Sequence, residues 1–385
     1  MSQRKYLTFG SPQIMQEEKD LVMECLNSSW LGTGPRVAEF EKSFAHFKGV
    51  ETALAVNSCT AALHISLIVA NINPGDEVIT SPLTFCATVN SIIHAGGIPV
   101  LADIDPVTFN IDPNQVINKI TSKTKALIPV HFAGRPCEMD PLMEIAKKYD
   151  LKVIEDCAHA VEAEYKGKKI GTFGDFGCFS FYSTKNVVCG EGGMILSKKN
   201  EDHSRLKVLS LHGMSKDAWN RFGSDGFKHY QVTECGFKYN MMDIQAAIGI
   251  PQLQRLEKNW LRRGEIWDRY MNELQELPIK LPSKNDENTK HGLHLFTVRV
   301  NEKRSGISRD GFLDALHSKG IGCGVHYLSI PEHPYYQQKF KWHPDMWPNA
   351  RDVGREVVSL PISPKLVDED VDDVITAVRS IFNFK

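Results

Sequence analysis

Lys185 ends an apolar and aromatic run, FSFYSTKN (179–186), that is typical of a protein interior. A lysine held away from water loses the solvation of its ammonium form, and its pKa falls by ~3–5 units when burial is complete. The neutral amine then attacks carbonyl compounds. A lone lysine more often reaches the surface from the end of a strand. However, the three glycines of the following CGEGGM (189–194) indicate a backbone held close to another group.

Asp156 follows the short apolar run of LKVIEDCAHA (151–160). Ligands of parallel α/β sheets bind beyond the carboxyl ends of the strands. A carboxylate at this point is therefore a candidate partner for a basic group of a ligand. The alternative is a helix N-cap, a position that Asp favours, and taken alone Asp156 fits that alternative better.

Two further segments could bind other parts of a ligand. NSCTAALHISL (57–67) is expected to be a helix whose first turn carries Ser58 and Thr60, and helix N-termini bind anions. Simple N-capping explains these hydroxyls equally well. Phe85 follows the strand-like run EVIT and could stack on a flat ring at the mouth of a sheet, although a lone Phe more often belongs to the core.

Together the four segments match one ligand. Pyridoxal 5′-phosphate (PLP) has an aldehyde for Lys185, a basic ring nitrogen for Asp156, a flat ring for Phe85 and a phosphate for the helix that begins near Ser58. The chain contains neither the G-x-x-x-x-G-K of a nucleotide P-loop nor the G-x-G-x-x-G of a dinucleotide fold. Their absence counts against a nucleoside triphosphatase and against a nicotinamide-linked oxidoreductase.

The elements that must position these residues alternate between short β-branched runs and amphipathic stretches from residue 51 to about 200. This pattern predicts an α/β fold with a mostly parallel sheet. Helical periodicity over 243–275, interrupted by Pro251, predicts a helix pair or a kinked helix. We predict a large α/β domain with the N-terminal helices at 1–250 and a smaller α+β domain at 251–385.

Composition narrows the range of partners. The 385 residues carry 45 basic and 47 acidic side chains, so no strong net charge favours nucleic acid or an anionic membrane. Nine scattered cysteines without a C-x-x-C pair indicate a reducing cytoplasm and no metal site. No run approaches the ~18 apolar residues of a membrane span, and the first residues do not read as a signal peptide.

Eight segments also carry a family resemblance: SSWLGTGP, GDEVITSPLTF, IPVHFAGRP, VIEDCAHA, FSFYSTKN, GEGGM, GFKYNMMDIQAAIG and GISRDGFLDALHSKGIGCGVHY. Over nearly its full length the sequence resembles the DegT/DnrJ/EryC1/StrS family of PLP-dependent nucleotide-sugar aminotransferases. That family has the fold-type I architecture, with a seven-stranded sheet. LHGMSKDAW and the GISRD…GIGCGVHY segment resemble the branch that aminates C4 of UDP-4-keto sugars to form UDP-4-amino-4-deoxy-L-arabinose.

The resemblance implies a role for each matching residue. Lys185 would bind the cofactor covalently, Asp156 would pair with its ring nitrogen, and Phe85 matches a stacking aromatic that is often Trp or Tyr in relatives. His159 matches a residue near the cofactor face and His326 lies in a segment near the sugar pocket, although a lone His is more often structural. The residues that match the phosphate-binding positions are Ser58, Cys59, Thr60, Ser180 and, from the partner subunit of a homodimer, Asn240.

The implied reaction is transamination in two half-reactions, with pyridoxamine 5′-phosphate as the intermediate cofactor form. Glutamate is the expected amino donor and a nucleotide-linked keto sugar the acceptor, in lipopolysaccharide or other cell-surface glycan synthesis. Relatives that carry histidine in place of the lysine remove a hydroxyl instead, and position 185 is Lys. A C3 keto sugar, a dTDP or GDP carrier and a non-catalytic relative remain alternatives.

Overall fold

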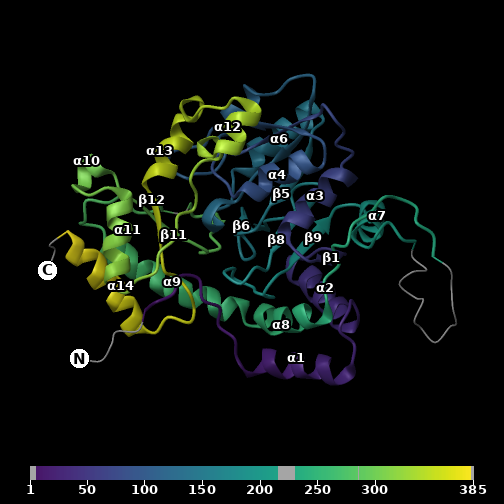
Figure 1. Ribbon diagram of the computed structural model, residues 1–385, viewed down its shortest axis with the longest axis horizontal. Helices are drawn as coiled ribbons and strands as arrows, with labels where there is room; N and C mark the ends of the chain where they lie inside the picture. The colour runs from purple at the N-terminus through teal and green to yellow at the C-terminus, as the bar shows by residue number, and fades with distance from the viewer. Residues whose placement is uncertain (1–5, 216–229, 285, 383–385) are drawn as a thin grey trace.

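The computed structural model describes residues 6–215, 230–284 and 286–382 (Figure 1). Every predicted site residue falls in these ranges, whereas the last four residues of LHGMSKDAW do not. No helix within them is long and apolar enough to cross a membrane.

A mixed, mostly parallel sheet forms the centre of the described chain. Its strands, in spatial order, are β1 (Ala53–Val56), β9 (Gly193–Ser197), β8 (Phe176–Ser180), β5 (Lys152–Asp156), β4 (Thr124–Ile128), β2 (Glu77–Thr80) and β3 (Ile98–Leu101). The strands from β8 to β3 run parallel, and β9 is antiparallel to both of its neighbours. The predicted α/β class and seven-stranded sheet are confirmed.

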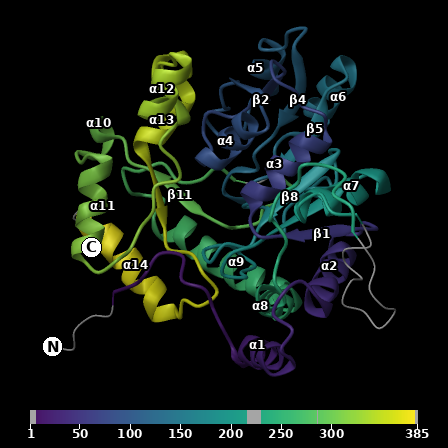
Figure 2. The same ribbon diagram turned by 45° about the vertical axis from the view of Figure 1, so that its right-hand side comes forward.

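Both faces of this sheet are covered, as the continuous apolar strands require. Alternate residues of β1 and β8 enter two separate cores: Ala53 and Phe179 face one, Leu54 and Cys178 the other. Most helical side chains in these cores come from α2 (Pro35–Lys48), α3 (Cys59–Val69), α4 (Cys86–His94), α6 (Met139–Tyr149), α7 (Asn200–Ser210) and α8 (Asp243–Gln254) (Figure 2). A short α5 (Pro113–Ile117) precedes β4 and adds Val116 to the core that holds Phe179.

The predicted helix pair is present, but its break lies elsewhere. Pro251 is inside α8, and the chain breaks at Arg255 before α9 (Leu256–Glu273). Proline removes one N–H and crowds the preceding turn, yet packing of α1 (Gln16–Ser28) and α2 against α8 holds the helix together. The Asp243 carboxylate adds to this packing by accepting the N–H groups of Gly34 and Val37 at the start of α2.

The remaining elements complete the C-terminal part, which lies apart from the main sheet in Figure 1. A two-stranded sheet pairs β11 (Phe296–Arg299) with β12 (Val357–Leu360). Around it lie α10 (Glu302–Ser305), α11 (Arg309–Ser318), α12 (Pro334–Phe340), α13 (Pro348–Glu356) and α14 (Asp368–Ile381). Three two-residue strands, β6 (Glu164–Tyr165), β7 (Lys168–Lys169) and β10 (Thr289–Lys290), form a further sheet. The domain boundary at residue 250 stays a prediction.

Candidate active site

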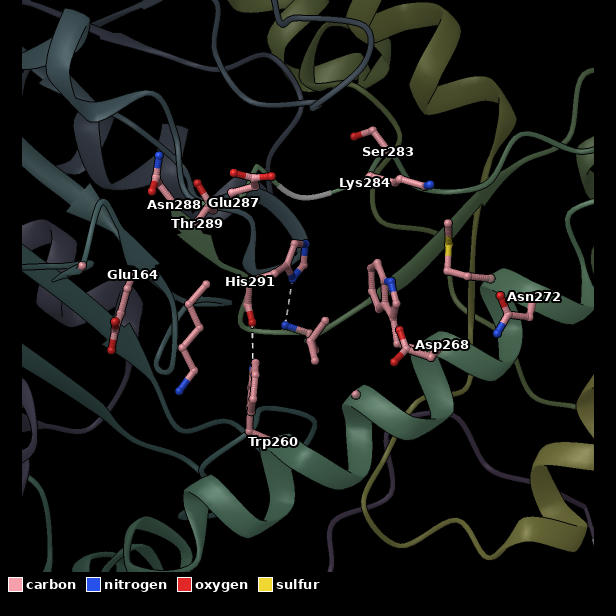
Figure 3. A pocket seen from close by; sticks show the side chains of 16 residues that line it. Glu164, Trp260, Asp268, Asn272, Ser283, Lys284, Glu287, Asn288, Thr289 and His291 are labelled. Atoms are coloured by element: carbon pink, nitrogen blue, oxygen red, sulfur yellow. Dashed lines mark hydrogen bonds between the residues drawn. The ribbon is translucent and has the colours of Figure 1, made fainter.

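Two cavities among the described residues are candidates for the active site, and the larger of the two lacks the expected chemistry. It measures about 950 Å³ and lies between α9 and residues 283–284 and 287–291, with Trp260 on its wall and the carboxylates of Glu164 and Asp268 around it (Figure 3). A second cavity of about 480 Å³ shares none of its lining residues. This second cavity, called the catalytic cavity below, is lined by nine of the ten predicted site residues: Ser58, Cys59, Thr60, Phe85, Asp156, His159, Ser180, Lys185 and His326.

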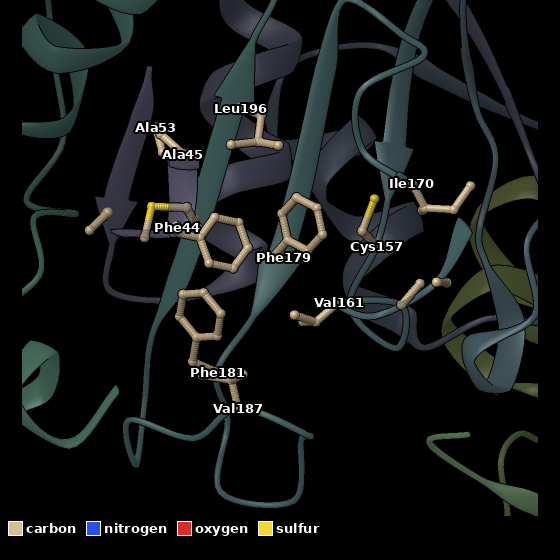
Figure 4. Close-up of a cluster of buried hydrophobic side chains, with 14 of the residues drawn as sticks. Phe44, Ala45, Ala53, Cys157, Val161, Ile170, Phe179, Phe181, Val187 and Leu196 are labelled. Carbon is tan, nitrogen blue, oxygen red and sulfur yellow. The ribbon is translucent and has the colours of Figure 1, made fainter. Parts of the chain in front are cut away.

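Strand alternation brings the end of β8 to this cavity. Phe179 and Phe181 pack against Phe44 with ring centroids 5.1 and 5.5 Å away (Figure 4). Ser180, between them, therefore points to the other face of the sheet, where it lines the cavity. The two phenylalanines of FSFYSTKN thus pack one face of the strand into the core, and Ser180 on the other face lines the site.

Lys185 lies in the loop that follows. A turn bond from its N–H to the carbonyl of Tyr182 measures 2.9 Å, and the next side chain, Asn186, donates to the Gly292 carbonyl. These bonds fix the loop while the Lys185 side chain faces the cavity. Burial lowers the pKa of the Lys185 amine to about 8, and the nearby Asp156 charge opposes part of that shift. About a tenth of the amine is therefore neutral at pH 7, far more than for an ordinary lysine.

Asp156 is the last residue of β5 and is almost fully buried. Burial raises the pKa of its carboxyl group, opposed by hydrogen bonds from Thr88 Oγ1 at 2.8 Å and the Ala158 N–H at 3.2 Å. The N-cap alternative is wrong, because the next element along the chain is the strand β6 and not a helix. The carboxylate instead faces the catalytic cavity together with Lys185.

The first turn of α3 provides an anion-binding end. Ser58 Oγ accepts the N–H of Ala61 at 3.1 Å, so Ser58 is also an N-cap. The first-turn amides of Cys59 and Thr60 have no acceptor within the helix, and both residues line the cavity. Gly193 explains part of the glycine-rich segment, since a Cβ there would lie 2.6 Å from the Ser58 carbonyl. Glycine lets β9 approach this helix end.

Aromatic side chains form another part of the cavity lining. Phe85 precedes α4 and is 56% exposed, with its ring 5.8 Å from that of Tyr327. The Tyr327 hydroxyl lies 3.0 Å from His159 Nε2, while His159 Nδ1 accepts the Ala133 N–H. Burial drives the pKa of His159 well below its ordinary value. In the resulting neutral ring the proton sits on Nε2 and is donated to Tyr327, whose own O–H is left for another acceptor.

His326 lines the same cavity from the C-terminal part. Its Nδ1 lies 2.9 Å from Ser359 Oγ and its ring packs near Phe9, with centroids 5.3 Å apart. Burial and the Lys185 charge lower the pKa of His326 to about 4. The imidazole is therefore neutral at ordinary pH and acts as a hydrogen-bonding group.

Asn240 is the one predicted residue outside the cavity lining. Its Nδ2 donates to Thr33 Oγ1 at 2.7 Å, and its buried Oδ1 has no hydrogen-bond partner among the described residues. The single chain therefore does not bring Asn240 to its own site. Its role in a partner's site stays a prediction.

Sequence reasoning missed Thr88 and Tyr327. Thr84 donates to Thr88, which in turn donates to Asp156, so a hydroxyl chain holds that carboxylate. Thr88 stands three positions after Phe85 near the start of α4, and i, i+3 spacing on a helix could have indicated the shared face. Tyr327 follows His326 directly, but nothing local marks it as a partner of His159.

A buried trio at the edge of the cavity, to whose lining His131 belongs, has ligand-like chemistry. The side chains of His131, Glu155 and Cys157 place their ligand atoms within 4.8 Å of one another. Both Glu155 oxygens already accept backbone N–H groups, from Gly171 and Gly174 among others. Backbone donors thus satisfy the carboxylate, which needs no cation to compensate its burial.

The donor set fits pyridoxal phosphate. An amine with a lowered pKa, a buried carboxylate, an aromatic face and a helix N-terminus line one cavity, and they complement the aldehyde, ring nitrogen, ring face and phosphate of that molecule. The volume of the catalytic cavity, about 480 Å³, is within the usual range for small-molecule sites, ~300–1,000 Å³.

Comparison with known proteins agrees with this chemistry. Residues 12–379 match the DegT/DnrJ/EryC1/StrS aminotransferase family. The spore coat polysaccharide biosynthesis protein SpsC of Bacillus subtilis is 47% identical, over 98% of this chain and 97% of its own length. The solved putative sugar aminotransferase Spr1654 of Streptococcus pneumoniae, in its pyridoxamine phosphate form, has a TM-score of 0.90 at 32% identity over 98% of both chains.

A second solved relative is PseC of Helicobacter pylori, an aminotransferase involved in the biosynthesis of pseudoaminic acid. It has a TM-score of 0.91 at 30% identity, over 98% of this chain and 99% of its own. The Streptococcus protein has also been solved in its PLP form. The chain therefore belongs to the DegT/DnrJ/EryC1/StrS aminotransferase family and is a PLP-dependent sugar aminotransferase.

Proposed function

We propose that this enzyme transfers an amino group from L-glutamate to the C4 keto group of a UDP-linked 4-keto sugar, for a cell-surface polysaccharide or lipopolysaccharide. The observation that carries the proposal is the lysine at 185, which faces the same cavity as Asp156. The segment resemblance to the UDP-4-keto branch supports the choice of acceptor, and the name of SpsC supports polysaccharide synthesis. The free cysteines support a cytoplasmic location.

In the proposed mechanism each residue acts at a defined atom. Bound PLP supplies an electron sink that stabilises negative charge on the donor's α-carbon. Lys185 Nζ takes the proton from that carbon, and in the second half-reaction it delivers a proton to C4 of the sugar. General acid–base transfer of this kind contributes ~10²–10⁴-fold in rate.

The other side chains hold the reacting groups in place. Asp156, whose carboxylate accepts hydrogen bonds from Thr88 and the Ala158 N–H, would hold a proton on the ring nitrogen by a charge-assisted hydrogen bond. Phe85 would cover one ring face, and the first turn of α3 with Ser180 would bind the phosphate. We assign His159 to the cofactor face through Tyr327, and His326 to the sugar.

A panel experiment tests the acceptor. The aminated enzyme is mixed with UDP-, dTDP- and GDP-linked 4-keto sugars and with a C3 keto sugar, and return of the absorption of lysine-bound cofactor is followed. We expect the fastest return with a UDP-linked 4-keto sugar and an amine at C4 of the product. Faster reaction with a C3 keto sugar or another carrier would replace this proposal by that alternative.

We further propose a homodimer with shared sites. Asn240 would complete the phosphate site of the partner through its Nδ2 amide group, which within this chain donates to Thr33 Oγ1. Four apolar side chains are 45–52% exposed on and just after α1 and could form part of the interface: Met23, Leu26, Trp30 and Leu31. Mixing Lys185→Ala with Asn240→Ala chains should restore activity above either alone, because one site of the hybrid keeps both residues. Absence of restoration would contradict site sharing.

A further inference from the structure

A buried ion pair lies close to the loop that carries Lys185. It joins Arg263 of α9 to Glu162, which lies between β5 and β6, and the two side chains are 2% and 1% exposed. Removing two charges from water is costly, and an apolar pair of similar volume often gives equal or greater stability. Stability alone is therefore a weak explanation for this pair, and its other contacts give a better one.

Asn186, the residue directly after Lys185, connects the ion pair to the loop. Its Nδ2 lies 2.9 Å from Glu162 Oε2 and 2.8 Å from the Gly292 carbonyl oxygen. Both of these oxygens only accept, so the NH₂ group must face them, and Oδ1 then accepts the Nδ1–H of His294 at 3.0 Å. The amide therefore has a single orientation, and it fixes the backbone next to Lys185.

His294 extends these contacts to the catalytic cavity. Its ring centroid lies 4.5 Å from that of His159, which lines that cavity. Burial and the Lys185 charge drive the pKa of His294 well below its ordinary value, so its ring is neutral and brings no positive charge near the amine. A separate space of about 30 Å³ is lined by Lys185 together with Asn186, Arg263 and His294. We call Asn186, Glu162, Arg263 and His294 the Asn186 network.

We infer that the Asn186 network is a positioning device that holds the Lys185 amine in its reactive direction. None of the four residues lines the catalytic cavity, so each acts through Lys185 and not on a substrate. Reacting groups must be held within ~0.5 Å of their productive geometry by contacts of this kind. The inference rests on the proposed function for the role of Lys185, and it is independent of which keto sugar accepts the amine.

Asn186→Ala tests the network at its centre. Alanine removes the hydrogen bonds of the amide and leaves the ion pair in place. Covalent attachment of added PLP to the cofactor-free protein, followed by absorbance, should slow by about 10- to 100-fold, because a misplacement of ~1 Å can cost ~10²-fold. In the loaded enzyme kcat should fall while KM for glutamate stays near that of wild type. Asn272→Ala, at an exposed position of α9, is the control and should change neither rate.

A double variant separates positioning from stability. Glu162→Leu or Arg263→Met alone leaves one buried charge without its partner and should lower the urea midpoint, whereas the two together should restore it. Attachment of PLP should nevertheless stay slow in the double variant, because Asn186 has lost its carboxylate acceptor. Recovery of both the urea midpoint and the attachment rate would mean that the ion pair is only structural, and the inference would be overturned.

A second ion pair provides the matched control. Arg299 of β11 and Glu356 at the end of α13 lie 2.6 Å apart, and neither lines a space with Lys185. Arg299→Met with Glu356→Leu should leave the attachment rate unchanged.

The attachment experiment also distinguishes the two proposals. If PLP attaches to Lys185 in wild type and equally fast in Asn186→Ala, the positioning inference is overturned and the proposed function stands. If borohydride reduction and mass spectrometry place the cofactor on another residue of wild type, both fall. If PLP attaches to Lys185 and depends on Asn186, but no UDP-linked 4-keto sugar is aminated, the network stands and the proposed acceptor falls.

Discussion

Lys48 and Lys185 lie in two regions that look alike electrostatically and differ in use. Burial lowers the pKa of each amine to about 8. Lys48, the last residue of α2, is only 3% exposed, and its Nζ donates to the Val161 and Ile170 carbonyls at 2.7 and 2.9 Å. The Lys48 nitrogen also lies 4.4 Å from the centre of the Phe179 ring. Lys185 instead faces the catalytic cavity.

The difference teaches that a lowered pKa alone does not mark a reactive lysine. Lys48 uses its protons to satisfy two backbone carbonyls from separate loops, so its nitrogen has no room for a carbonyl substrate. Lys185 has a comparable desolvation but an open approach and a carboxylate, Asp156, across the cavity. Access and a second ligand-binding group distinguish a proposed catalytic lysine from a structural one.

The largest effect is expected for Lys185→Ala. Loss of the amine removes both the covalent attachment point and the proposed general base, which alone is worth ~10²–10⁴-fold. Turnover should fall below detection together with the absorption of lysine-bound cofactor, while the urea midpoint stays close to that of wild type. Measurable turnover in this variant would refute the assignment of Lys185.

Lys48→Met is the matched control, and it should lower stability while leaving turnover intact. Methionine fills similar space but leaves two buried carbonyls without a donor, at ~1–3 kcal/mol each. Relief of the buried charge offsets part of this cost, so we expect the free energy of unfolding to fall by about 2 kcal/mol. Urea titration measures the loss, and kcat should remain near that of wild type. A large loss of kcat would show that this region also serves the reaction.

Asp156→Asn should slow turnover by roughly 10- to 100-fold, the value of one hydrogen bond to a charged group, ~1.5–3 kcal/mol. The amide keeps the shape and removes the charge that would hold the ring nitrogen protonated. Steady-state kinetics with glutamate measures the effect, and Asp150→Asn, beyond the end of α6, is the control. An unchanged rate would mean that this carboxylate does not face the ring nitrogen.

The smallest effect concerns pH. An amine is protonated and unreactive below its pKa, and the pKa of Lys185 is about 8. Its rate of reaction with added PLP should therefore rise about tenfold for each unit of increasing pH up to pH 7 and level off above pH 8. Stopped-flow absorbance of the cofactor-free protein gives this profile. Borohydride reduction and mass spectrometry should then find the label on Lys185 and not on Lys48. A label on Lys48 would remove the distinction based on access.

Two structural details could not be predicted from local sequence patterns. Pro251 predicts a break in the 243–275 helix, but α8 continues past it and the break comes at Arg255. Packing against α1 and α2 outweighs the local cost of proline. Likewise, Asp156 resembles a helix N-cap in the sequence. Only the tertiary structure shows that its carboxylate caps no helix and accepts hydrogen bonds from the Thr88 hydroxyl and the Ala158 N–H.

The sequence by itself determined the α/β class, with its mostly parallel sheet, and the segments that end at the site. Apolar runs of strand length, with polar residues at their ends, are local patterns that dictate which residues emerge at one edge of a sheet. Only the tertiary structure decided that Tyr327 bonds to His159, that Thr88 holds Asp156 and that Lys48 is sealed against two carbonyls. Those pairs join segments far apart along the chain, and no local propensity specifies the distance between them.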